Sequence, residues 1–442
     1  MPDQMQVRDT IFALSSGALP SGVAIIRISG SATREVLQQM TSGVPKARHA
    51  VLSTIKGQDG AVLDRGLCLF FPGPASFTGE DCAELHLHGG RAVVAAVLDQ
   101  LAGFPRLRMA DAGEFTKRAF LNGKMDLTGA EALSDLIAAE TEAQRRFALA
   151  NSSETHRRLY GSWRRRLIHA RAMIEAELDF ADESDVAGSV AEAVWQDISN
   201  LSREISDHAS SYKSAEIIRD GFQVVILGAP NAGKSSLLNA LAKRDVAIVT
   251  DEPGTTRDIL EVSLDIAGMK IVLADTAGIR EAGGRVEALG IERSIARARE
   301  ADLILLLEDV TNPSLVQGLP ERPILRLGNK ADLALGTNTP NYDCLISAKT
   351  GQGLDELLEL LQRASAGYLD RASDVLPFRA RHVALLNEAV YALQAAAQAE
   401  EQGLELSAES LRAASDALGR ITGEIDVEDL LDTIFSTFCI GK

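Results

Sequence analysis

A glycine-rich loop in the middle of the chain has the residue types and the spacing that bind phosphate. Residues 228–235 read GAPNAGKS, follow the apolar run FQVVIL at 222–227, and precede a predicted helix at 236–243. Glycines let the backbone curl so that its N–H groups and a helix N-terminus can face phosphate oxygens. We expect Lys234 to reach the β- and γ-phosphates and the Ser235 hydroxyl to ligate Mg²⁺. The strand–loop–helix context makes a chance match improbable.

Two further loops supply groups that a magnesium–nucleotide complex needs. Residues 254–258 read GTTRD and precede a predicted strand at 259–266, so we assign Thr256 as a second Mg²⁺ ligand that senses the γ-phosphate. Residues 275–278 read DTAG and follow a predicted strand at 269–274. Asp275 suits a water-mediated Mg²⁺ contact, and the Gly278 N–H suits a γ-phosphate contact. The loop at 254–258 is interpreted as switch I, and the charged segment 280–292 that follows DTAG as switch II.

The predicted base site selects guanine. Apolar runs at 303–307 and 323–327 indicate buried strands, and NKAD follows at 329–332. Asp332 can accept hydrogen bonds from the guanine N1–H and 2-amino groups, which adenine does not offer. SAK at 347–349 would cover the base. The predicted GTP contacts are Asn231, Ala232, Gly233, Lys234, Ser235, Ser236, Thr250, Thr255, Thr256, Asp275, Thr276, Ala277, Gly278, Asn329, Lys330, Asp332, Ser347, Ala348 and Lys349.

The residue that orients the attacking water is not fixed by these motifs. Ile279 stands after DTAG, where Ras-type enzymes carry a glutamine, and isoleucine cannot orient water. The charged segment 280–292 holds four residues that could do so: Glu281, Arg285, Glu287 and Glu292.

The changes in composition and hydrophobic periodicity along the chain predict several domains of the α/β and all-α classes. Short β-rich runs at 23–28, 66–71 and 83–88 and a helix at 91–101 indicate a small α+β domain. Segments 128–180, 190–214 and 379–438 have helical character and flank the β/α alternation that begins at Phe222. We predict an α+β domain over 1–122, a discontinuous helical domain over 123–217 and 369–442, and an inserted Ras-like P-loop GTPase domain with a doubly wound sheet over 218–368.

Composition limits the partners and the compartment. The formal net charge of -17 argues against a generic nucleic-acid binder, although six arginines fall within residues 157–171. We favour a solvated helix face for these arginines and leave their role open. Four scattered cysteines predict reduced thiols, and no apolar run approaches the roughly 20 residues that span a bilayer. We expect a cytoplasmic protein with no membrane association and no secretory signal.

The chain resembles the MnmE (TrmE) family of bacterial tRNA-modification GTPases over essentially its whole length. The resemblance is carried by AIIRISG at 24–30, FTGED at 77–81, ELHLHGG at 84–90, GEFTKRAFLN at 113–122, the phosphate loop, and FCIGK at 438–442. It implies a homodimer whose GTPase domains associate with help from K⁺, which takes the place of an arginine finger. The implied K⁺ ligands are Asn231, Thr250, Glu252 and Thr255, and the implied water-orienting glutamate is Glu287.

The resemblance also implies that the N-terminal domain binds 5-formyl- or 5,10-methylene-tetrahydrofolate. The matching positions are Arg27, Glu84, Lys124 and Lys442, and a carboxylate can grip the pterin edge while cations hold the glutamate tail. Cys439 matches the family's C-terminal cysteine, which could serve chemistry, but a lone cysteine is more often buried. His86 and His88 share a strand face, and we interpret them as strand packing because no third metal ligand is apparent.

In this family the protein works with an FAD-dependent partner. Together they add an aminomethyl-type group, including the carboxymethylaminomethyl form, to C5 of the wobble uridine (position 34) of certain tRNAs, with folate supplying the one-carbon unit. Two alternatives stay open: a regulatory or ribosome-assembly GTPase with flanking interaction domains, and a stand-alone tRNA-binding protein with a vestigial GTPase. The folate positions and the C-terminal motif argue against the first. The intact nucleotide motifs argue against the second.

Overall fold

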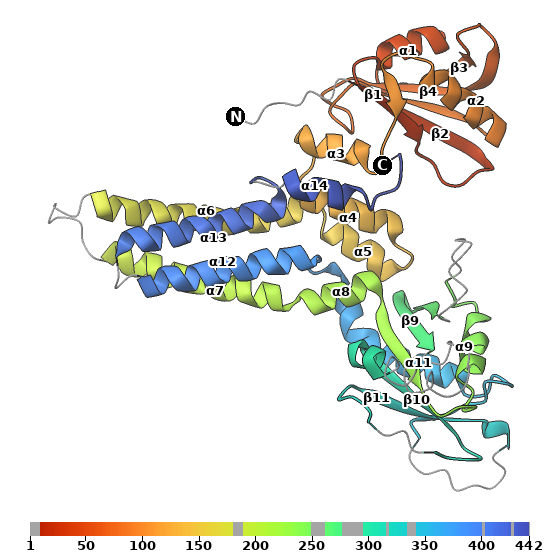
Figure 1. Ribbon diagram of the computed structural model, residues 1–442, viewed down its shortest axis with the longest axis vertical. Helices are drawn as coiled ribbons and strands as arrows, with labels where there is room; N and C mark the ends of the chain where they lie inside the picture. Colours follow the sequence, from red (N-terminus) through yellow and green to blue (C-terminus); the bar gives the residue numbers. More distant parts are fainter. Residues whose placement is uncertain are drawn as a thin grey trace, which may run out of the picture. The chain divides into compact units, whose positions relative to one another are not determined.

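The computed structural model describes residues 9–179, 189–248, 261–275, 295–314, 318–333, 342–399, 403–425 and 428–441 (Figure 1). The chain forms two compact units, each assembled from segments that are distant in sequence. Unit 1 contains residues 1–134, 156–165 and 415–442, and unit 2 contains residues 135–155 and 166–414. Each unit is built around one six-stranded sheet.

The sheet of unit 1 is mixed and has the strand order β3-β4-β5-β2-β1-β6. All neighbouring pairs are antiparallel except β1 and β6, which are parallel. The strands are β1 (Thr10–Leu14), β2 (Ser21–Ser29), β3 (Val51–Lys56), β4 (Val62–Phe71), β5 (Cys82–Gly89) and β6 (Leu107–Met109).

Strict alternation in β2 and β5 separates the core face from a polar face. Successive side chains of a strand point to opposite sides of a sheet. Ile26 and Ile28 of β2 and Leu85 of β5 are therefore buried, whereas Arg27 and Glu84 lie on the other face. Arg27 and Glu84 are directly opposite each other in the β2–β5 register. Strand pairing thus brings together Arg27 and Glu84, two of the four predicted folate contacts.

The core face of this sheet is covered by α1 (Thr33–Met40) and α2 (Arg91–Ala102). On the opposite face, α3 (Glu114–Leu121) packs Phe115 against Ile11 and Ala13 of β1, and α14 (Glu428–Phe435) contacts α3. A second apolar cluster joins Leu127 and Ala130 of α4 (Leu127–Ala138) to Leu431, Phe435 and Phe438 near the end of the chain. The first and last parts of the chain thus share one core within unit 1.

The sheet of unit 2 has the order β12-β11-β10-β7-β9-β8 and is parallel except for the antiparallel β8–β9 hairpin. Its strands are β7 (Phe222–Leu227), β8 (Glu261–Ile266), β9 (Met269–Asp275), β10 (Leu303–Asp309), β11 (Ile324–Asn329) and β12 (Cys344–Leu345). The central strands β7, β9 and β10 are almost wholly buried, which explains their nearly continuous apolar sequences.

The remaining helices surround this sheet or pair with one another. They are α9 (Lys234–Ala242), α11 (Leu354–Asp370), α5 (Glu142–Ala150), α6 (Ser153–Asp179), α7 (Ser189–Ser210), α8 (Tyr212–Asp220), α12 (Ala380–Ala399) and α13 (Leu404–Thr422), with short 3₁₀ turns η1 (Ala331–Leu333) and η2 (Arg371–Ser373). Helices α7 and α12 lie side by side along their length (Figure 1).

The predicted multidomain α/β and all-α fold class is confirmed. The four predicted domain ranges are a finer division than the two compact units and stay a prediction. Within the described residues, no helix is both long enough and apolar enough to cross a membrane.

Candidate functional site

The predicted phosphate loop connects β7 to α9 in unit 2. Gly233 caps α9 in the left-handed region, with a φ of 100°. A Cβ atom at this position would lie only 2.2 Å from Nδ2 of Asn329, so a larger residue cannot be accommodated without displacing that side chain. Asn231 also has a positive φ, of 65°, and is exposed. The loop therefore presents the first turn of α9 at the carboxyl edge of the sheet, where such folds bind nucleotides.

Lys234 and Ser235 open α9 and have different partners. The ammonium of Lys234 donates to the carbonyl oxygens of Gly228 (2.9 Å) and Ala229 (3.1 Å), and its side chain arches over the loop. Burial lowers the pKa of Lys234, and the charge of Asp275 opposes this shift. The Ser235 hydroxyl donates to Oδ2 of Asp275 at 2.7 Å. The two side chains predicted to serve Mg²⁺ are in direct contact although they are 40 positions apart.

Asn329, at the end of β11, joins the phosphate loop to the predicted base loop. Its Nδ2 donates to the Ala232 carbonyl (2.8 Å), and its Oδ1 accepts from the Ala348 N–H (3.1 Å). The side chain is almost completely buried. Asn329 was predicted to contact GTP, and the structure shows its amide engaged within the protein. The motif predicted its location but not this bridging role.

The base side of the site contains a cavity of about 510 Å³ between α9 and residues 348–351. Ser236, Ala348 and Lys349 line it, and all three are predicted GTP contacts. Asp332 lies in η1, and the Ala331 N–H donates to the Ile346 carbonyl at 3.1 Å, which joins the NKAD and SAK segments. Lys330 pairs with Asp309 at 2.5 Å. Ser347 is buried, and its hydroxyl accepts from the Thr350 N–H.

Several predicted site residues lie outside the described part of the chain. These are Thr250, Glu252, Thr255, Thr256, Thr276, Ala277, Gly278, Glu287 and Lys442. Their roles as nucleotide, K⁺, folate or water contacts stay predictions.

The three described folate positions are on the polar face of the unit 1 sheet or on the connection after α3. Arg27 pairs with Glu84 (Nη2–Oε1 3.0 Å), and both side chains keep partial exposure. The second carboxylate oxygen of Glu84 is 3.2 Å from Nε2 of His86. Lys124 is exposed and lies against Gly79. A partly exposed carboxylate with cations nearby can bind a ligand that carries both a hydrogen-bonding ring and acidic groups.

The histidines contact carboxylates of strand residues, and the C-terminal cysteine differs from what the sequence suggested. His86 contacts Glu84 of β5, and His88 contacts Asp64 of β4 at 2.8 Å. Cys68, Cys82 and Cys344 are buried, as free thiols, whereas Cys439 is exposed. The described residues contain no group of three or more His, Cys, Asp or Glu side chains placed to hold a metal.

Ion pairs occupy much of the arginine-rich stretch on α6. Arg166 pairs with Asp197 (2.6 Å) and Glu204 (2.8 Å), and Arg171 pairs with Glu175. Arg164 pairs with Glu424. These carboxylates neutralise the stretch locally, which agrees with a structural interpretation of the arginines.

Comparisons with known proteins agree with the geometry. A family model described as the GTP-binding protein TrmE N-terminus matches residues 10–124, and one described as the MnmE helical domain matches residues 127–439. A relative from Chelativorans sp. (strain BNC1), named tRNA modification GTPase MnmE, is 74% identical over 100% of both chains. A protein of the same name from Mesorhizobium japonicum is 59% identical over 98% of this chain and 99% of its own.

A solved structure, the G domain of the T. maritima FeoB iron transporter, is 26% identical and covers 32% of this chain and 98% of its own, with a TM-score of 0.26. A score this low adds nothing to the description of the fold. The full-length identity of the relatives confirms the predicted family and the GTPase class of enzyme. The chain belongs to the MnmE family of tRNA modification GTPases.

Proposed function

We propose that this chain is a K⁺-stimulated GTP hydrolase of tRNA wobble-uridine modification. With an FAD-dependent partner protein, it would add an aminomethyl or carboxymethylaminomethyl group to C5 of uridine 34 in certain tRNAs, using a folate one-carbon unit. The support is the Ser235–Asp275 contact at the phosphate loop, in a chain whose relatives are named tRNA modification GTPases. The protein would act as a cytoplasmic homodimer.

The nucleotide chemistry follows from the groups at the ends of β7 and β9. Lys234 would exchange its two carbonyl partners for phosphate oxygens, because a phosphate offers the ammonium a full negative charge. Ser235 and Thr256 would hold Mg²⁺, and Asp275 would hold it through water. The Ser235–Asp275 pair fits this role because it already gathers a hydroxyl and a carboxylate, the hard oxygen donors that Mg²⁺ prefers. When bound, Mg²⁺ neutralises charge on the phosphates.

Potassium would be held beside the phosphate loop. Asn231 is exposed in the phosphate loop, so its side chain is accessible to an ion. Thr250, Glu252 and Thr255 would complete the ligand set. A fixed cation near the β- and γ-phosphates stabilises charge that develops in the transition state. Glu287 would orient the attacking water.

Folate would bind over the polar face of β2 and β5. Glu84 would accept hydrogen bonds from the pterin edge, and the cations Arg27, Lys124 and Lys442 would hold the acidic tail. The side chains fit this ligand class, because the Arg27–Glu84 pair is partly exposed and Lys124 is exposed. Cys439 is also exposed and could take part in the modification chemistry.

The decisive experiment compares GTP turnover by the purified protein in KCl and in NaCl at equal ionic strength. We expect turnover to be at least about tenfold faster in KCl, because one removed transition-state contact typically costs more than that. In the Glu287→Ala variant, turnover in KCl should fall by about 100-fold or more. Glu292→Ala, a neighbouring glutamate, is the matched control and should keep the K⁺ response.

Equal turnover in the two salts would remove the potassium mechanism while leaving a GTPase. That outcome would favour a regulatory GTPase with flanking interaction domains. If Glu292→Ala loses turnover while Glu287→Ala keeps the wild-type turnover, the water-orienting role belongs to Glu292.

A further inference from the structure

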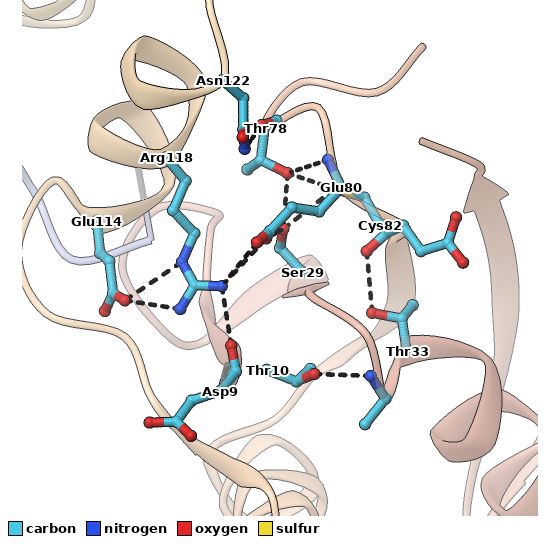
Figure 2. Close-up of polar contacts among 12 residues, drawn as sticks. Asp9, Thr10, Ser29, Thr33, Thr78, Glu80, Cys82, Glu114, Arg118 and Asn122 are labelled. Carbon is cyan, nitrogen blue, oxygen red and sulfur yellow. Dashed lines mark hydrogen bonds and ion pairs between the residues drawn. The ribbon is translucent and has the colours of Figure 1, made fainter. Parts of the chain in front are cut away.

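A buried arginine ties three segments of unit 1 together (Figure 2). The Arg118 side chain, on α3, is 2% exposed. Its guanidinium pairs with Glu114 (Nη2–Oε1 2.9 Å) and Glu80 (Nη1–Oε2 3.1 Å) and donates to the Asp9 carbonyl at 2.9 Å. A charge at this depth is tolerated only when its donors are satisfied, and these partners satisfy them.

The network is larger than one arginine. Glu114 also pairs with Arg108 (2.6 Å), so two cations and two carboxylates balance one another. Ser29, at the end of β2, donates to Oε2 of Glu80 at 2.7 Å and lies 2.7 Å from the Thr78 hydroxyl. Figure 2 shows that Glu80 and Thr78 face α3 from one side while Ser29 supports them from the sheet.

This network holds the 77–81 loop, the segment FTGED that connects toward β5. Asn122, after the end of α3, adds a hydrogen bond from Nδ2 to the Thr78 carbonyl at 2.7 Å. The loop is therefore fastened to α3 at two points, Thr78 and Glu80. Hydrogen bonds and ion pairs are directional, so they fix the orientation of the loop as well as its distance from α3.

The 77–81 loop touches two of the proposed folate contacts. The Arg27 guanidinium lies 5.3 Å from the centre of the Phe77 ring. Arg27 also lies 5.8 Å from the ring of Phe115, which belongs to α3 itself. In the middle of the loop, a Cβ added to Gly79 would lie 3.4 Å from Cγ of Lys124, so the Lys124 side chain runs beside this glycine. The loop therefore adjoins both Arg27 and Lys124.

We propose that Arg118 and Glu80 are positioning residues for the folate site. They do not touch the ligand themselves. They fix the 77–81 loop on α3, and the loop sets the separation of Arg27 and Lys124, two of the cations that would hold the acidic tail of the ligand. This inference rests on the proposed folate site and gives a role to Arg118 and Glu80, which lie in the strings GEFTKRAFLN and FTGED but had no role assigned from the sequence.

The test is a calorimetric titration of the full-length protein with 5-formyltetrahydrofolate. The Glu80→Gln variant keeps the size of the side chain and its bond to Ser29 but removes the charge that holds Arg118. We expect the Kd to rise by about tenfold or more, as for other groups that orient a ligand's direct partners, with unchanged stoichiometry. Asn122→Ala, which removes one surface hydrogen bond to the loop, should raise the Kd by a smaller factor.

Two reference variants separate the possible outcomes. Arg34→Ala is the matched control, because Arg34 pairs with Asp81 of the same loop (2.6 Å) but has a 54% exposed side chain and no bond to α3. It should keep the wild-type Kd. Arg27→Ala reports on the folate site itself, and an unchanged Kd in this variant would overturn the proposed site rather than the positioning role.

The positioning role is overturned if Arg27→Ala weakens binding while Glu80→Gln and Asn122→Ala keep the wild-type Kd. It is also overturned if Glu80→Gln lowers only the stoichiometry, because that result means a smaller folded fraction with intact sites. If Glu80→Gln does not fold, the Kd of Asn122→Ala relative to Arg34→Ala decides the question.

Discussion

Asn329 connects the two halves of the nucleotide site at the level of single atoms. One end of its amide holds the phosphate loop at Ala232, and the other holds the base loop at Ala348. Because an amide carries both a donor and an acceptor, one side chain satisfies both loops. The distance between the predicted phosphate and base contacts is thereby fixed by the protein.

Asp332 should determine which base is bound. The Asp332→Asn variant replaces an acceptor-only carboxylate by an amide whose NH₂ faces the guanine donors. We expect the affinity for GTP to fall by about 100-fold, from the loss of two charge-assisted hydrogen bonds. Affinity for xanthosine triphosphate should rise, because xanthine has a carbonyl in place of the 2-amino group. Nucleotide titrations check this exchange, and unchanged GTP affinity would remove Asp332 from the base site.

Glu114 should make unit 1 less stable in acid. Burial raises the pKa of the Glu114 carboxyl, but hydrogen bonds from Arg108, the Asp111 N–H and Arg118, with the charge of Arg118, outweigh burial and leave the pKa below its ordinary value of 4.5. A carboxyl whose pKa is lowered on folding adds stability above its unfolded pKa and loses it as the pH falls through the folded value. The wild type should therefore lose stability progressively below pH 4.5.

Urea unfolding at a series of pH values measures the free energy of unfolding. Hydrogen exchange in peptides from α3 then shows whether the loss of stability lies in unit 1. In Glu114→Gln, the acid-dependent loss of stability should be smaller than in the wild type. Glu35→Gln is the control, because the two described partners of Glu35, Arg106 and Gln39, form exposed contacts with it. An identical pH dependence in Glu114→Gln and wild type would contradict the prediction.

The nucleotide site was largely predictable from sequence, and the network around Arg118 was not. Phosphate loops and base motifs are short strings with a fixed mechanism, so Lys234, Ser235 and Asp275 could be placed at strand ends before the fold was known. Arg118 and Glu80 are 38 positions apart and carry ordinary surface residue types. Only the packing of α3 against the 77–81 loop reveals that their charges are buried together.

At the scale of elements, α5 anchors the β8–β9 hairpin of unit 2. The Ala143 N–H, in the first turn of α5, donates to the Gly268 carbonyl in the hairpin turn at 2.9 Å. Glu140 pairs with Lys270 of β9 at 2.5 Å. Strand β9 ends at Asp275, so the helix fixes one end of a strand whose other end lies in the nucleotide site.

Gln144 should stabilise this arrangement more than any surface pair of α5. Its Oε1 accepts from the N–H groups of Glu140 (2.8 Å) and Thr141 (3.1 Å), and its Nε2 donates to the Arg219 carbonyl (2.7 Å) just before β7. Gln144→Ala removes one buried and two partly buried hydrogen bonds, so we expect the free energy of unfolding to fall by about 1–3 kcal/mol. Urea unfolding measures the loss of unfolding free energy, and hydrogen exchange in peptides from α5 and β9 shows where the structure is destabilised.

Glu142→Ala provides the control for Gln144→Ala in the same helical turn. Glu142 is exposed and pairs only with Arg145 among the described contacts. Its removal should leave exchange in α5 and β9 unchanged. Equal effects of the two substitutions would mean that the α5 cap does not hold the hairpin.

Element types were predicted better than their ends. The strand at 222–227 has the predicted bounds, but α9 begins at Lys234 rather than at residue 236, because the phosphate loop itself forms the first helical turn. The helical stretch 128–180 is divided into α4, α5 and α6. The break before α5 comes from the Thr141–Gln144 capping box, which satisfies the N–H groups of a new helix start.

At the scale of the whole molecule, charge is used mainly for internal pairing. The net charge is -17, and Arg164, Arg166 and Arg171 of the arginine-rich stretch each pair with a carboxylate. Cations that neutralise phosphates release the counterions condensed on a nucleic acid, and these three arginines already face carboxylates. A tRNA partner would therefore contact this chain through other groups, or through the partner protein of the proposed complex.

The chain termini belong to one folding unit, and this predicts how a distant substitution acts. Phe435, near the C-terminus, is 2% exposed and packs in one cluster with Leu127 and Ala130 of α4. The adjoining backbone pairs with the start of α3, where the Gly113 N–H donates to the Cys439 carbonyl at 3.3 Å. We expect Phe435→Ala to lower the free energy of unfolding of unit 1 by about 3–5 kcal/mol, the usual cost of a buried phenylalanine.

Hydrogen exchange shows whether Phe435→Ala destabilises the core shared with α3 and α4 or only α14. In Phe435→Ala, exchange should accelerate in α3 and α4, more than 300 positions earlier in the sequence, as well as in α14. Ser436→Ala alters an exposed neighbour whose hydroxyl bonds only within its own turn, so exchange in α3 and α4 should stay as in the wild type. Acceleration confined to α14 would show that the C-terminal segment docks on a core that is already complete. Acceleration in all three helices would mean that α3 and α4 need the end of the chain to reach their full stability, and that the segment with Cys439 is held in place by the cluster that it shares with α4.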